Sequence, residues 1–159
     1  MVFSGGIIRI TIYHLRFIGH LFDVCTETWQ EQDINQKLEG LRPRSVCISG
    51  SFPSLGVNLI FGGEVDPSAK EHQGAGEFEN DLVLLDESDG TYLDSIRGDG
   101  DWPEARGWSD GDCLDNGDSV GLMFFFGGLA GDDVNPRRLN DLWRLEIEKE
   151  EKEENQFND

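Results

Sequence analysis

One loop of this sequence carries side chains that can bind a metal ion. Glu64, Asp66 and His72 lie in the polar loop that follows the glycine pair Gly62-Gly63. Two carboxylates and one imidazole are suitable ligands for a divalent transition metal and leave positions open for a substrate. The loop also has an ordinary structural interpretation, because Asp66-Pro67-Ser68 is a turn signal and His72 can cap or pack the loop. Both interpretations require strands that hold the loop in place.

The segments around this loop occur twice. Phe61-Gly62-Gly63 is followed by Asn80-Asp81-Leu82, and Phe126-Gly127-Gly128 is followed by Asn140-Asp141-Leu142. Matching positions lie about 60 residues apart, and a fixed period of this kind indicates a repeat architecture. Short apolar runs between Gly-, Asp- and Asn-rich turns predict antiparallel strands, and four such strands form one blade of a β-propeller. We therefore expect an all-β fold, a partial propeller with about two clear four-stranded blades and a remnant.

The repeat also predicts the limits of each unit. In the first clear unit we expect strands at 44–51, 57–61 and 81–86 and a fourth beginning at 91–93. In the second unit we expect strands at 121–126 and 142–147, with the glycine pair ending the first of them and a loop at 129–139. The acidic segments 98–101 and 110–118 are expected to be loops. The predicted organisation is a degenerate first unit at 1–41, blades at 42–95 and 96–147, and an acidic disordered tail at 148–159.

Charge and cysteine content exclude several classes of protein. The 159 residues carry a formal net charge of −19, with a pI near 4.3. Nucleic-acid binding needs a basic face and anionic membranes repel acidic proteins, so neither partner is expected. The three cysteines are widely spaced and lack zinc-site spacing, which favours reduced thiols in the cytoplasm. The apolar segment 7–22 is interrupted by Arg and His, so it reads as neither a signal peptide nor a membrane helix.

The repeat resembles the Kelch repeat. The resemblance rests on a Gly-Gly pair, then a hydrophobic-Asp step such as Leu85-Asp86, then Thr91-Tyr92 in the place of a Thr-x-x-Trp-like step. It covers residues 42–147 well and residues 1–41 poorly. The resemblance implies a β-propeller built from blades of this type.

Two segments resemble a narrower group of Kelch proteins. Residues 61–76 (FGGEVDPSAKEHQGAG) and 103–108 (PEARGW) are similar to the nitrile-specifier, epithiospecifier and thiocyanate-forming proteins and their fungal relatives. That resemblance implies a lyase-type activity that directs glucosinolate-type aglucones to nitriles with Fe²⁺. The iron motif Glu-x-x-x-Asp-x-x-x-His carries over to Glu64 and His72. Its middle position is Ser68 in this chain, and Asp66 is the nearest carboxylate that could replace it.

Arg44 and Arg106 occupy matching places ahead of the second strand of each unit. In the specifier-like interpretation Arg106 would hold a sulfate or similar oxyanion, because the guanidinium fork matches oxyanion geometry. The alternative is that both arginines donate hydrogen bonds to carbonyl groups between blades, since repeated positions are commonly architectural.

Two functions remain open at this point. One is a specifier-like protein acting on a small-molecule substrate at an Fe²⁺ site. The other is a non-catalytic Kelch module that binds a protein partner through an acidic surface on loops 64–79 and 129–139, or a truncated fragment without function. Propellers close with about four to eight blades, so we expect this chain to be a fragment that needs further blades to close the ring.

Overall fold

The computed structural model describes most of the chain between residues 41 and 148 and parts of the N-terminal segment. The described residues are 7–9, 19–23, 25–32, 41–66, 68–70, 74–98, 101–117 and 119–148. Within these ranges the regular structure is all β-strand, which confirms the predicted all-β class. No helix in these ranges has the length and apolar character needed to cross a membrane.

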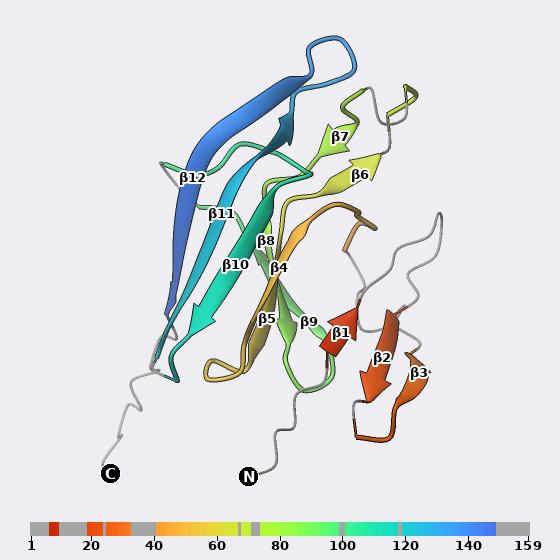
Figure 1. Cartoon of the computed structure of the whole chain (residues 1–159), viewed down its shortest axis with the longest axis vertical. Coiled ribbons are helices and arrows are strands. Elements are labelled where there is room, and N and C mark those ends of the chain that lie inside the picture. Colours follow the sequence, from red (N-terminus) through yellow and green to blue (C-terminus); the bar gives the residue numbers. More distant parts are fainter. Residues whose placement is uncertain are drawn as a thin grey trace, which may run out of the picture.

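The strands form separate small antiparallel sheets, and none of the sheets closes on itself (Figure 1). The sheet orders are β1-β2-β3, β4-β5-β8-β9, β6-β7 and β10-β11-β12. The strand bounds are β1 Ile7–Arg9, β2 Gly19–Asp23, β3 Thr28–Gln32, β4 Ile48–Phe52, β5 Val57–Phe61, β6 Glu64–Asp66, β7 Glu77–Phe78, β8 Leu82–Asp86, β9 Tyr92–Ile96, β10 Asp110–Asp115, β11 Val120–Ala130 and β12 Arg137–Glu148.

The four-stranded sheet β4-β5-β8-β9 confirms the predicted strands of the unit at 42–95. Its two central strands, β5 (VNLIF) and β8 (LVLLD), are apolar at successive positions because both of their faces are covered. The first strand begins later than expected, at Ile48. Residues 41–47 form an irregular lead-in that touches the β6 strand through the bridge between Ser45 and Glu64.

The second sheet differs from the expectation at three points. It has three strands in the described part of the chain, where a four-stranded blade was predicted. Strand β11 continues through Gly127-Gly128, because a bulge there shifts its register with β12 and the strand does not end. Strand β10 occupies 110–115, where an acidic loop was expected, since Asp110 and Asp112 face outward while Cys113 lies against β4.

The main core lies between these two sheets. Phe61 from β5 stacks on Phe125 from β11, with ring centroids 4.8 Å apart. The partly buried indoles of Trp102 and Trp143 pack at the edge of the same cluster. A second, smaller cluster of Ile60, Val83 and Leu85 covers the opposite face of the first sheet.

The glycine pairs join the two sheets through the backbone. Gly63 has φ of 101° and Gly128 has φ of 108°, a left-handed conformation that a side chain rarely allows. The Gly63 N–H donates to the Arg106 carbonyl at 2.8 Å, and the Arg106 N–H donates to the Glu79 carbonyl at 3.2 Å. The lead-in of the second unit is therefore fixed by hydrogen bonds to Gly63, which precedes the β6-β7 hairpin, and to Glu79, which follows it.

Candidate functional site

The predicted metal-binding loop begins as the short hairpin β6-β7 at one end of the first sheet. Glu64 and Asp66 both lie on β6, and the Glu64 carboxylate accepts a hydrogen bond from the Gly76 N–H at 3.2 Å. Ser68 follows β6 and donates its hydroxyl hydrogen bond to Asp133, a residue of the next unit. His72 lies outside the described residues, so its position relative to Glu64 is a prediction only.

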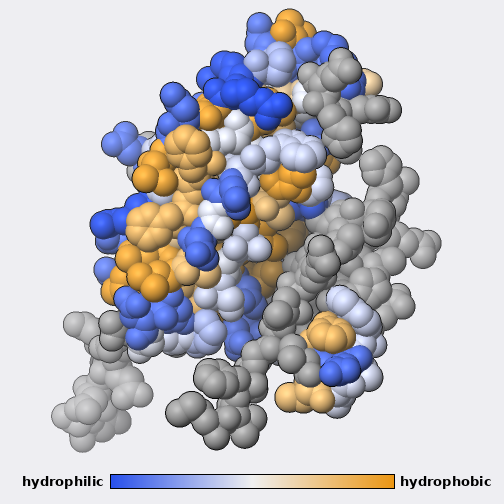
Figure 2. All heavy atoms as spheres, in the orientation of Figure 1, coloured by the Kyte–Doolittle hydropathy of each residue, from blue (hydrophilic) through white to orange (hydrophobic). Residues whose placement is uncertain are grey.

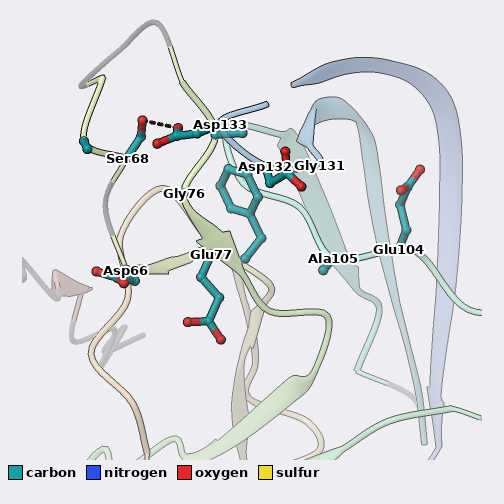
Figure 3. Close-up of a pocket in the computed structure, with 12 residues that line it drawn as sticks. Asp66, Ser68, Gly76, Glu77, Glu104, Ala105, Gly131, Asp132 and Asp133 are labelled. Carbon is teal, nitrogen blue, oxygen red and sulfur yellow. Dashed lines mark hydrogen bonds between the residues drawn. The ribbon is translucent and has the colours of Figure 1, made fainter. Parts of the chain in front are cut away.

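The hairpin forms one wall of a depression of about 670 Å³. The opposite wall comes from the loop between β11 and β12 and from the lead-in to the second sheet (Figure 3). The depression is lined by Asp66, Ser68, Ala69, Ala75, Gly76, Glu77, Phe78, Glu104, Ala105, Gly131, Asp132 and Asp133. Its rim thus carries five carboxylates drawn from three separate segments of the chain.

The floor of this depression is apolar. Ala75, Phe78 and Leu129 form a buried cluster, and Ala105 packs against it. An apolar floor under an acidic rim can accept a long side chain that has an aliphatic stem and a positive end. The site is therefore chemically suited to lysine or arginine side chains.

Most of the rim carboxylates already have partners. Glu77 makes a bidentate ion pair with Arg42, with both N–O distances 2.9 Å, and Arg42 holds the pKa of the Glu77 carboxyl below its usual value. Glu104 pairs with Arg137 at 2.5 Å. Asp66 has no hydrogen-bond or ion-pair partner among the described residues, so it is the rim carboxylate that is most available to a ligand.

The two aspartates of the β11–β12 loop shape that loop. Asp132 accepts hydrogen bonds from the Val134 and Asn135 N–H groups, both at 2.8 Å, and these bonds lower the pKa of its carboxyl. Asp133 accepts from Ser68, and its backbone carbonyl accepts from Lys70. These contacts fasten the loops of the two units to each other across the depression.

No group of three metal-binding side chains comes together in the described ranges, which include Glu64 and Asp66 but omit His72. Within those ranges the carboxylates of β6 act separately. Glu64 accepts a backbone hydrogen bond, and Asp66 is among the residues that line the depression.

The two arginines are buried in matching ion pairs. Arg44 donates to both carboxylate oxygens of Asp81, at 2.6 and 3.1 Å, and to the Gly62 carbonyl at 3.1 Å. Arg106 donates in the same way to Asp141, at 2.7 and 2.9 Å, and to the Gly127 carbonyl at 3.1 Å.

This geometry matches the architectural alternative in that each arginine donates to a carbonyl group, but that carbonyl lies in the arginine's own unit and not in a neighbouring one. Each guanidinium ties the glycine pair to an aspartate of the same unit: Asp81 directly precedes β8, and Asp141 lies within β12. The Arg106 fork, predicted as an oxyanion holder, points at Asp141, so an oxyanion would have to displace that carboxylate.

The carboxylates of these pairs are stabilised in their charged form. The hydrogen bonds from Arg106 and Trp143 hold the pKa of the Asp141 carboxyl well below its usual range, although partial burial opposes them. Burial raises the pKa of Asp81, but the hydrogen bonds from Arg44 and Ser95 and the charge of Arg44 outweigh it and the net shift is downward. Both pairs are therefore ionised at neutral pH.

The sequence did not identify the arginine partners or the far wall of the depression. Asp81 and Asp141 belong to the repeated Asn-Asp-Leu segment, so recurrence of an acidic residue opposite a recurrent arginine was the signal available. Glu104 and Asp132 carried no comparable signal, because they meet Asp66 only after the two units pack together.

Comparison with known proteins adds no relative. No known family matches the sequence, and no curated protein resembles it closely enough to be counted as a relative. Function is therefore inferred from the residues and their arrangement.

Proposed function

We propose that this chain is a non-catalytic interaction module of the Kelch type, and that the acidic depression binds a lysine- or arginine-rich segment of a partner protein. The observation that carries the proposal is the combination of five rim carboxylates with an apolar floor in one hollow. The matching arginine–aspartate pairs and the matching positive φ values of the two glycine pairs support the repeat architecture on which it depends.

The loops that form the depression are those expected to bind a partner. Each loop connects strands within its own unit, and the two loops are held together by contacts between Ser68 and Asp133 and between Lys70 and the Asp133 carbonyl. A surface that is already fixed loses little conformational freedom on binding, which favours recognition of a short extended segment. A basic segment also suits the net charge of −19, because long-range attraction speeds its association.

The test is calorimetric titration of the protein with hexa-arginine at physiological salt concentration. Asp66→Asn removes a rim charge that has no partner among the described residues, and we expect about two- to fivefold weaker binding, as is typical of a rim charge pair. Glu148→Gln is the matched control, because it removes the same charge from the exposed end of β12, the end farther from the depression. Equal loss of affinity in the two variants would show that the peptide responds only to net charge, which contradicts the proposal.

A second proposal is the specifier-like activity with Fe²⁺. It is favoured by Asp66, which has no partner among the described residues and follows Glu64 by two residues on the same short strand. Glu64, Asp66 and His72 would be the ligands, and the metal would supply a Lewis-acid centre for a sulfur-containing substrate. In this proposal Arg106 keeps its place in the ion pair with Asp141.

Anaerobic titration with Fe²⁺ separates the two proposals. Saturable binding that is lost in both Glu64→Ala and His72→Ala supports the metal site. Binding that is absent, or that is unchanged in both variants, rejects it and leaves the peptide-binding proposal untouched.

A further inference from the structure

An exposed apolar face covers the outer side of the β10-β11-β12 sheet. Figure 2 shows apolar side chains gathered over these strands. Phe126 is 55% exposed, Leu142 is 70% exposed and Leu114 is 47% exposed. Phe126 and Leu142 line a shallow hollow of about 560 Å³ that is also lined by Phe124 and Asp112. Large exposed apolar patches commonly mark sites of protein association.

The internal repeat shows what this face corresponds to in the first sheet. The strand pairing gives the row Ile48, Phe61 and Leu82 in the first sheet and the row Asp110, Phe126 and Leu142 in the second. In each row the central phenylalanine directly precedes the glycine pair of its unit, so the two rows are equivalent.

Equivalent side chains differ sharply in exposure. Phe61 is 0% exposed and Leu82 is 6% exposed, because the inner face of the second sheet covers them. Phe126 and Leu142 have no such cover in the described structure. The outer face of the second sheet is thus equivalent to the face of the first sheet that the second sheet covers.

We propose that the outer face of the β10-β11-β12 sheet docks a further antiparallel sheet of the same repeat type, supplied from outside these 159 residues. The occupant presents apolar side chains placed like Met123 and Phe125, which cover the first sheet. The internal interface alone supports this docking, which is independent of what the acidic depression binds.

Two other occupants fit less well. The segment 149–159 has Phe157 as its one apolar side chain, so its composition cannot supply an apolar sheet face. A second copy of this chain in the same arrangement would have to offer the face of Ile60, Val83 and Leu85, and that face is already buried within the copy.

The occupant must differ from the second sheet at one point. Gly50 on β4 faces Cys113, and a Cβ at Gly50 would lie 3.0 Å from the Cys113 Cβ. The position equivalent to Gly50 is Asp112, which carries a side chain. A sheet that docks here therefore needs a smaller residue than cysteine opposite Asp112.

A tandem protein tests the proposal. Residues 1–146 are followed by a second copy of 87–148, so that residues 87–96 supply the strand that returns to the glycine end of the sheet, as β9 does in the first sheet. The added copy carries Cys113→Gly, which makes room for Asp112 and removes a thiol. Leu142→Cys is placed in either the inner or the terminal copy, and alkylation is followed by mass spectrometry of the peptide 139–144. We expect the inner thiol to react at least about tenfold more slowly than the terminal thiol, because labelling of a covered site needs local opening.

Three results decide the outcome. Equal alkylation rates at the two positions overturn the proposal, whether or not the added copy folds elsewhere in the tandem protein. Protection that persists when Phe124→Ser and Phe126→Ser are introduced in the inner copy also overturns it, since the docking face is then polar. In the 159-residue chain with Leu142→Cys, protection that increases with protein concentration would identify a second copy as the occupant and reject a sheet from outside the chain.

Discussion

The two arginine–aspartate pairs allow one prediction to be made against an internal reference. Asp81→Asn and Asp141→Asn remove the same charge from equivalent positions without changing side-chain shape. Arg44 and Arg106 are almost completely buried. The aspartates differ, because the side chain of Asp81 is 10% exposed and that of Asp141 is 40% exposed.

We expect Asp81→Asn to lower the free energy of unfolding by about 3–5 kcal/mol, the usual cost of leaving one member of a buried pair behind. The Arg44 guanidinium would keep the Gly62 carbonyl as its remaining acceptor, and its Nε already lacks a partner among the described residues. Asp81 also accepts a hydrogen bond from Ser95, which would be weakened.

Asp141→Asn should cost less, about 1–3 kcal/mol, because water reaches the half-exposed side chain and compensates part of the loss. Arg106 also retains two carbonyl acceptors, Glu104 at 3.1 Å and Gly127 at 3.1 Å. The predicted difference between the two variants is therefore about 2 kcal/mol.

Urea unfolding followed by tryptophan fluorescence measures both values, since Trp102 and Trp143 lie at the interface of the two sheets. Asp101→Asn is the control, because Asp101 is exposed and should change stability by less than about 0.5 kcal/mol. If Asp141→Asn costs as much as Asp81→Asn or more, burial does not set the strength of these pairs and the reasoning is wrong.

Three further predictions follow from the same interface. The folded state holds the pKa of Asp141 below its unfolded value, so the stability that the ionised carboxylate adds is present at neutral pH and is lost as the pH falls below about 4. In Asp141→Asn, the urea midpoint should therefore fall less steeply with decreasing pH in the acid range than it does in the parent protein. Gly128→Ala should destabilise by about 2 kcal/mol or more in urea unfolding, because φ is 108° and the new methyl group would lie 2.7 Å from the Gly107 carbonyl. Phe61→Ala should cost about 3–5 kcal/mol and Phe126→Ala less than about 1 kcal/mol, and similar unfolding midpoints for the two would contradict the assignment of inner and outer faces.

The sequence predicted the first sheet better than the second for a physical reason. Strands β5 and β8 are covered on both faces, so nearly every residue is apolar and the pattern is unambiguous. Strand β10 has one exposed face and reads Asp-Gly-Asp-Cys-Leu-Asp, a composition shared with acidic loops. Its strand conformation is imposed by pairing with β11 and by contact with β4, which are tertiary effects.

The glycine pair was recognised from the sequence, but the sequence did not show whether it ends a strand or forms a bulge within one. A Gly-Gly step commonly ends a strand, and at Gly62-Gly63 the sheet does break before β6 begins. At Gly127-Gly128 the same two positive φ values produce a bulge inside one continuous strand. The difference depends on what pairs beyond the glycines, and that information lies in residues distant along the chain.

The candidate site could be located from the sequence only in part. The loop after Gly62-Gly63 was predicted, and Asp66 does line a hollow. The opposite wall comes from the following unit, whose lead-in residues Glu104 and Ala105 are held by the backbone hydrogen bonds of Arg106. A single unit therefore cannot form this depression.

This dependence connects the two proposals. The hydrogen bond from the Gly63 N–H to the Arg106 carbonyl fixes the joint between units, and the depression opens directly beside that joint. A further sheet on the outer face would place its own lead-in beside Gly127-Gly128, in the manner in which Arg106 lies beside the first pair. The loop 131–136 would then form one wall of a second depression. We therefore expect one binding site for a basic segment at each joint between units. The tandem protein should bind hexa-arginine at one more site than the parent chain. A calorimetric stoichiometry that the added unit leaves unchanged would show that a joint between units does not create a binding site.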